Sequence, residues 1–267
     1  GSISYIDINA STLNTEGAYS LKALNDTSAS GLSTTTIIKT NGTINNGVSI
    51  ESQSGADSTI LVNIFEDLSG GTNSNPAVYF NASAVGDSAI TLNIGAITSY
   101  SGIQSNNYSQ NGMANTYMNL AGDINVDSTA ISINNYGYNG SSIVNFNSKN
   151  IAAESYGLDI YNSNGDGDTL THIEVDGDIR TRTGTAVNLS GYANQGTSSL
   201  KFRANNIISG SYGLNISNYT QHGEVLTDIA LTGDITATSG SGMTFSAYSN
   251  EGNANTSIAL NNVMTYG

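Results

Sequence analysis

The sequence predicts an all-β fold: a single parallel β-helix, right-handed, of about nine coils. Three observations predict it. Apolar anchors recur with a period of about 28 residues, short stretches alternate apolar and polar residues, and turn-forming residues separate those stretches. No stretch carries a 3.6-residue apolar stripe, so we expect almost no helix. The right-handed sense is expected because crossover connections between parallel strands are overwhelmingly right-handed.

The coil period follows from a repeated segment and its anchors. Asn150 to Ile160 recurs 56 residues later as Asn206 to Ile216, and both copies contain Ser-Tyr-Gly-Leu. Intervening anchors divide that interval into two coils of about 28 residues, and all anchors are expected to point inward and stack. The anchors are Ile124, Ile151, Ile179, Ile207, Ile235 and Val263, with Ile97 and Leu68 continuing the series toward the N-terminus. We expect irregular first coils or a cap over residues 1–60 and regular coils of one continuous solenoid over 61–267.

Each coil contains short strands with one buried face. The alternations are Leu158-Asp-Ile160, Ile173-Glu-Val175, Val187-Asn-Leu189, Leu200-Lys-Phe202, Leu214-Asn-Ile216 and Ile229-Ala-Leu231. The Asn, Gly, Ser and Asp clusters between them are turn formers. A propeller blade of about 40 residues exceeds this period, and a sandwich would show no period.

Composition excludes several classes of partner. Only 7 Lys and Arg stand against 21 Asp and Glu, so the net charge is −14 and nucleic acid is not an expected partner. An anionic membrane surface is disfavoured for the same reason, and no apolar run is long enough for direct membrane insertion. With 37% hydrophobic and 10% charged residues, the chain is expected to pack a core. The absence of Cys excludes disulfides, thiolate metal sites and cysteine nucleophiles.

Stacked coils place equivalent residues one above another, and a column of alternating Asp and Asn follows. It consists of Asp123, Asn150, Asp178, Asn206, Asp234 and Asn262. Carboxylates at every second rung invite a metal or acid/base interpretation. The favoured interpretation is a turn-capping ladder, because Asn and Asp cap turns with their own side chains and stack as amide ladders.

A second column is aromatic. Tyrosines at one turn of each coil are followed four residues later by glycine: Tyr108, Tyr136, Tyr161, Tyr192, Tyr219 and Tyr248. This column has two compatible interpretations, a ladder of stacked rings and a platform for sugar rings or a partner protein. The predicted binding face is Tyr108, Tyr136, Tyr192, Tyr219 and Tyr248.

Charged side chains suggest local pairing. Glu174 and Asp176 are expected to point outward and to pair across neighbouring strands with Lys201 and Arg203.

Residues 162–168 alternate oxygen-bearing side chains with glycine, as calcium loops do, but lack the bidentate Glu of an EF-hand. An acidic turn is therefore the default interpretation.

The sequence offers few residues that could act in catalysis. We predict that the protein is not an enzyme and has no catalytic residue, bound metal or cofactor. His172 and His222 lie on coils that are not neighbours. The Gly-x-Ser-x-Gly elbow and the phosphate-binding loop are missing, as are the Gly-Asp-Asp and Gly-His-Gly motifs of polygalacturonase-type β-helices. The alternative is a polysaccharide lyase or glycosidase; a lyase would use Asp166 and Asp168 beside Arg180 or Arg182 as base.

Residues 60–267 resemble the passenger domain of a bacterial autotransporter (type V secretion) of the adhesin branch. The resemblance rests on the coil period, the Asn/Asp columns, the Gly-Asp-Ile turns, the absence of Cys and the excess of acidic residues. The resemblance implies an excised fragment of a longer passenger, exported unfolded and displayed extracellularly at the outer membrane of the bacterial cell surface. It also implies adhesion to a host surface protein or glycan, or self-association with another copy. A purely structural stalk that projects a distal domain is the remaining alternative.

Overall fold

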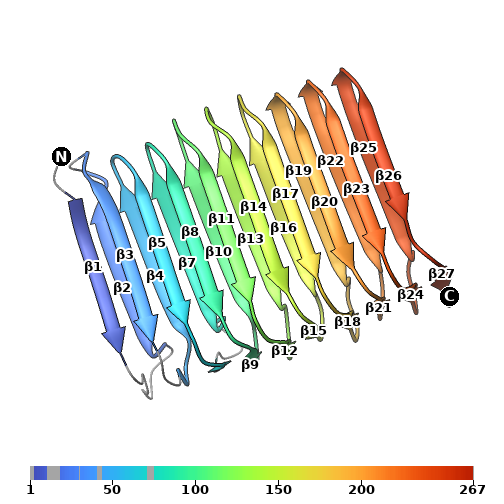
Figure 1. Cartoon of the computed structure of the whole chain (residues 1–267), viewed down its shortest axis with the longest axis horizontal. Coiled ribbons are helices and arrows are strands. Elements are labelled where there is room, and N and C mark those ends of the chain that lie inside the picture. The colour runs from blue at the N-terminus through green and yellow to red at the C-terminus, as the bar shows by residue number, and fades with distance from the viewer. Residues whose placement is uncertain (1–2, 11–18, 30, 41–43, 71–74, 267) are drawn as a thin grey trace.

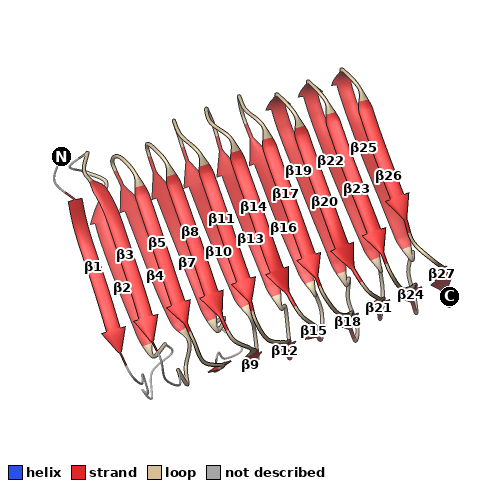
Figure 2. Ribbon diagram, viewed as in Figure 1, coloured by secondary structure: helices blue, strands red, loops and turns tan. Residues whose placement is uncertain are grey.

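The computed structural model confirms the predicted architecture. It describes residues 3–10, 19–29, 31–40, 44–70 and 75–266, and in this part of the chain every regular element is a β-strand (Figure 2). All strand pairings are parallel, and the chain winds steadily from one end of the molecule to the other (Figure 1). None of the described residues belongs to a helix that could cross a membrane.

Three parallel sheets form the walls of the solenoid. Sheet A contains β1 (Ile3–Ala10), β3 (Ser33–Thr40), β5 (Ser58–Ile64), β8 (Ser88–Ile94), β11 (Ala114–Leu120), β14 (Ser142–Ser148), β17 (Thr169–Val175), β20 (Ser198–Ala204), β23 (Val225–Leu231) and β26 (Ala254–Ala259). Sheet C contains β2 (Leu21–Thr27), β4 (Val48–Ser54), β7 (Val78–Ala84), β10 (Ile103–Ser109), β13 (Ile131–Gly137), β16 (Leu158–Asn164), β19 (Val187–Gln195), β22 (Leu214–His222) and β25 (Met243–Glu251). Sheet B contains β6 (Leu68–Ser69), β9 (Ile97–Ser99), β12 (Ile124–Val126), β15 (Ile151–Ala153), β18 (Ile179–Thr181), β21 (Ile207–Ser209), β24 (Ile235–Ala237) and β27 (Val263–Thr265).

Each turn of the solenoid runs through sheet C, sheet A and sheet B in that order. Sheet B follows the lower edge of the molecule in Figure 1, beneath the long strands of the other two sheets. Because side chains alternate between the two faces of a strand, the long strands bury every second residue in the interior. One continuous core results, filled largely by Ile, Leu, Val and Phe.

The predicted isoleucine anchors form the inner face of sheet B. Ile97 pairs with Ile124, and the register continues through the predicted anchors to Ile235 and Val263, one coil of about 28 residues at a time. The anchors from Ile97 to Ile235 are buried. The prediction that Ile124, Ile151, Ile179, Ile207 and Ile235 point inward and stack is confirmed, whereas Val263 in the last described coil is exposed.

The core also contains a row of buried asparagines on sheet C, here called the internal asparagine row: Asn107, Asn135, Asn162 and Asn218. Neighbours bond along the row, with Asn107 Nδ2 2.9 Å from Asn135 Oδ1 and Asn135 Nδ2 3.0 Å from Asn162 Oδ1. Gly191 occupies the equivalent position between Asn162 and Asn218. These bonds give the buried amides the hydrogen-bond partners that polar groups need inside a core.

Candidate functional site

The five predicted binding tyrosines lie in one row on the outer face of sheet C. The strand register places Tyr108 beside Tyr136 and Tyr192 beside Tyr219, which in turn lies beside Tyr248. We call these five residues the tyrosine row. Their position follows from the alternation of the strands, because each tyrosine comes directly after an inward-facing residue.

The rings of the tyrosine row stack on one another. The ring centroids are 5.4 Å apart for Tyr108 and Tyr136, 5.3 Å for Tyr192 and Tyr219, and 5.6 Å for Tyr219 and Tyr248. Planes are within 12° of parallel, and such pairs contribute about 0.5–1.5 kcal/mol each beyond their burial. The row is therefore a structural ladder, and its outer edges still face solvent, with Tyr108 and Tyr248 the most exposed.

The row is interrupted at one coil. Ser163 occupies the equivalent position of β16, between Tyr136 and Tyr192. Ser163 is only 1% exposed, so no open slot remains above it. The prediction that Tyr161 belongs to the same column is wrong, because Tyr161 lies two residues before Ser163 on the strand and pairs with Asn134 and Ser190. The tyrosine row thus consists of a pair and a triplet.

Glycine turns hold the triplet in register. The strands that carry Tyr192, Tyr219 and Tyr248 have nine residues each and end near a glycine four residues after the tyrosine. Gly196 has φ of +103°, a conformation that glycine adopts without strain. A Cβ on Gly223 would overlap the carbonyl oxygen of Gly196, so the turns stack too closely for a side chain.

The hydroxyl groups around the interruption influence one another. Partial burial, followed by the nearby phenols of Tyr108, Tyr138, Tyr161 and Tyr192, raises the pKa of Tyr136. The ring therefore stays a neutral phenol at physiological pH, able both to donate and to accept hydrogen bonds. At the C-terminal end of the row, the Tyr248 hydroxyl donates to Asn250 Oδ1 at 3.2 Å.

The Asp/Asn column is a hydrogen-bonded ladder on the outer surface. Asn150 Nδ2 donates to Asp123 Oδ1 at 3.0 Å, and Asn150 Oδ1 accepts the backbone N–H of Asp178 at 2.9 Å. The same pattern repeats from Asp178 through Asn206 to Asp234. Alternation suits this column because each Asn amide donates to the carboxylate of the coil before it, whereas two successive carboxylates would have no donor between them. The described residues contain no group of three or more metal-binding side chains.

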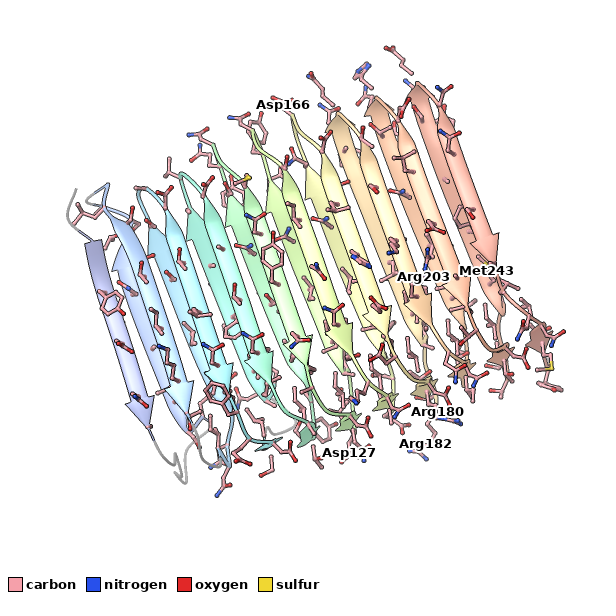
Figure 3. The ribbon with its side chains drawn as sticks, viewed as in Figure 1. Asp127, Asp166, Arg180, Arg182, Arg203 and Met243 are labelled. Carbon is pink, nitrogen blue, oxygen red and sulfur yellow. The ribbon has the colours of Figure 1, made fainter. Side chains whose placement is uncertain are left out.

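The residues that a lyase would need do not come together. Asp166 lies at one end of the strands, whereas Arg180 and Arg182 lie at the other, beside sheet B (Figure 3). Arg180 pairs with Asp178 at 2.6 Å, and Arg182 pairs with Glu154. Both guanidinium groups are thus engaged in surface ion pairs far from the acidic turn.

Side chains of the oxygen-rich turn at residues 162–168 form hydrogen bonds within the turn and to neighbouring coils. Asn162 belongs to the internal asparagine row, and Asn164 Oδ1 accepts the backbone N–H of Gly167 at 2.8 Å. Asp168 Oδ1 accepts the backbone N–H of Thr197 at 2.7 Å. The two histidines are on different sheets, with His222 bonded to Glu251 at 2.9 Å and His172 facing Glu174.

The predicted pairing of Glu174 and Asp176 with Lys201 and Arg203 is wrong. Among the described residues, Arg203 pairs with Asp228 on the next strand, β23. That aspartate offers both its carboxylate and its backbone carbonyl, the latter 2.9 Å from Arg203 Nη1, so one guanidinium is bound by two acceptors. Such a two-point contact outweighs a single bond to Glu174, its neighbour in the register.

Sequence reasoning missed the internal asparagine row. The available signal was the dipeptide Asn-Tyr at residues 107–108, 135–136 and 218–219, where strand alternation requires the asparagine to point inward if the tyrosine points outward. Comparison with known proteins adds nothing to this geometry, since no family model, curated protein or solved structure matches the chain.

Proposed function

We propose that this protein is an adhesin-type binding rod that attaches through the tyrosine row. The observation that carries the proposal is a ladder of stacked, solvent-facing phenols repeated along one sheet. Tyrosine combines a rigid apolar ring with a hydroxyl, at a low cost in side-chain entropy, and is favoured where proteins contact varied partners.

A repeated contact suits a rod. Each added rung acts at high effective concentration once the first rung has engaged, so weak contacts add to strong attachment. The ligand is a host surface protein, a glycan or another copy of this chain. The net charge of −14 argues against nucleic acid and anionic membranes as ligands.

The proposed setting is the bacterial cell surface, as the passenger of an autotransporter. A Cys-free solenoid suits export through an oxidising compartment, because its stability requires no disulfide and its coils fold from local contacts. A catalytic function is the weaker alternative, because the candidate residues for a lyase lie at opposite ends of the strands (Figure 3).

The test is adhesion and aggregation of cells that display the protein. Replacing Tyr192, Tyr219 and Tyr248 together by serine is expected to abolish attachment while the β-sheet circular dichroism spectrum persists. Loss of two stacked pairs should reduce stability by about 1–3 kcal/mol. The matched control replaces three exposed tyrosines outside the row, Tyr117, Tyr138 and Tyr266, by serine. Attachment that survives the first triple variant, or is lost equally in the control, would exclude the tyrosine row as the contact face.

A further inference from the structure

Two further tyrosines border a cavity at the other end of the sheet C strands, where the chain enters from sheet B. Tyr156 precedes β16 and Tyr212 precedes β22, each within the repeated Ser-Tyr-Gly-Leu sequence. The cavity between them has a volume of about 390 Å³. That volume falls in the range of ordinary small-molecule sites. Its lining consists of Tyr156, Thr185, Asn188, Tyr212, Asn215 and Thr244.

The spacing of the rungs leaves room for about one ring between Tyr156 and Tyr212. Tyr156 and Tyr212 are two rungs apart, because β19, which follows Thr185, pairs with β16 on one side and β22 on the other. Two rungs correspond to about 10 Å. A ring midway would be about 5 Å from each tyrosine, inside the range of stacked contacts. Stacked rings in the tyrosine row show the same spacing, because their successive centroids are 5.3–5.6 Å apart.

This gap is open, in contrast to the interruption at Ser163. Thr185 is partly exposed at the floor, and the flanking rings of Tyr156 and Tyr212 are 41% and 50% exposed. The repeat itself creates the space, because tyrosine alternates with a small residue at this position over three successive coils. Two exposed tyrosines therefore flank one small residue on three successive rungs.

A row of oriented amides forms the side of the cavity. Asn188 Nδ2 donates to Asp159 Oδ1 at 2.8 Å, and Asn215 Nδ2 donates to Asn188 Oδ1 at 2.7 Å. These bonds fix both amide planes before any ligand arrives. Each amide nitrogen retains a second N–H for a ligand hydroxyl. Preorganised donors cost little entropy on binding.

We propose that this cavity binds one neutral sugar ring between Tyr156 and Tyr212. The aromatic walls suit the C–H faces of a pyranose, and Asn188 and Asn215 suit its hydroxyl groups. A neutral ligand is favoured because no charged side chain lines the cavity and the protein carries a net charge of −14. The site goes beyond the tyrosine row, since it lies at the opposite edge of sheet C and is a discrete cavity.

The test uses saturation-transfer NMR and titration of the full chain with maltohexaose, cellohexaose and mannohexaose, with hexagalacturonate as the charged counterpart. At least one neutral oligomer is expected to bind with Kd of about 1 mM or tighter, and hexagalacturonate to bind more weakly. Tyr156→Ala and Tyr212→Ala should each weaken binding about two- to tenfold. Tyr156→Phe should retain it, and the control Tyr138→Ala should leave it unchanged.

Thr185→Tyr is the sharpest variant, because its ring should fill the gap from within, abolish sugar binding and leave the fold at least as stable. The serine triple variant of the tyrosine row should bind sugar normally, so the two sites are tested separately. The proposal is overturned if none of the three neutral oligomers binds at 10 mM, or if Thr185→Tyr binds as the unmodified protein does.

Discussion

Replacing Asn135 by alanine should destabilise the protein far more than the same change at its neighbour Asn134. Asn135 is 0% exposed, and its Oδ1 accepts bonds from Asn107 Nδ2 at 2.9 Å and Thr116 Oγ1 at 3.0 Å. Its Nδ2 donates to Asn162 Oδ1 at 3.0 Å. Truncation deprives the Thr116 hydroxyl of its acceptor and the Asn107 amide of one partner, in a place without bulk solvent.

Each buried polar group left unpaired costs about 1–3 kcal/mol, so Asn135→Ala should cost about 2–5 kcal/mol. Asn134 is exposed and bonds only to Asn106 Oδ1, at 3.1 Å, among the described residues. Asn134→Ala should therefore change stability by less than about 0.5 kcal/mol. Urea unfolding followed by circular dichroism measures both. Equal effects of the two variants would refute the internal asparagine row as a stabilising network.

Three further predictions concern the anchors, the turns and the surface ladder. Ile179→Ala should lower stability by about 2–5 kcal/mol in urea unfolding, because it removes a fully buried anchor from a packed stack; a loss below about 1 kcal/mol would contradict that packing. Gly210→Ala should lower stability by about 1–3 kcal/mol, because its Cβ would overlap the carbonyl oxygen of Arg182, and an unchanged melting temperature would show that the turn is not tightly stacked. Partial burial acts to raise the pKa of Asp178, but hydrogen bonds from Asn206 and Arg180 outweigh it and hold the pKa below its usual value. Its contribution to stability is therefore present above about pH 4 and lost as the pH falls through the depressed pKa. Asp178→Asn should flatten this acid limb in a series of melting temperatures against pH, and an identical limb in both proteins would contradict the assignment.

Those parts of the fold that depend on strict repetition were predictable from the sequence. Ile124, Ile151 and Ile179 recur at a nearly constant interval. Apolar residues at that spacing are explained by coils that stack on one another with these side chains pointing into the interior. The tyrosine row follows from the same register, because equivalent residues of successive coils must lie side by side.

Other parts depend on three-dimensional detail that a repeat does not encode. The partner of Arg203 is decided by the carbonyl of Asp228, which a list of charges does not reveal. The alternation of Tyr156, Thr185 and Tyr212 can be seen in the sequence, but the cavity also depends on how Asn188, Asn215 and Thr244 lie beside them. Buried asparagines oppose the usual rule that amides face solvent, and their position directly before an outward-facing tyrosine is the one sequence signal that they point inward.

Attachment through repeated contacts along the tyrosine row can be measured with a graded series of variants. Cells displaying variants with one, two, three or all five row tyrosines changed to serine would be compared in the force needed to detach them. A single change should have little effect, and attachment should fall steeply by the third, because each rung raises the effective concentration of the next. Full detachment force in the folded variant that lacks all five tyrosines would contradict the claim.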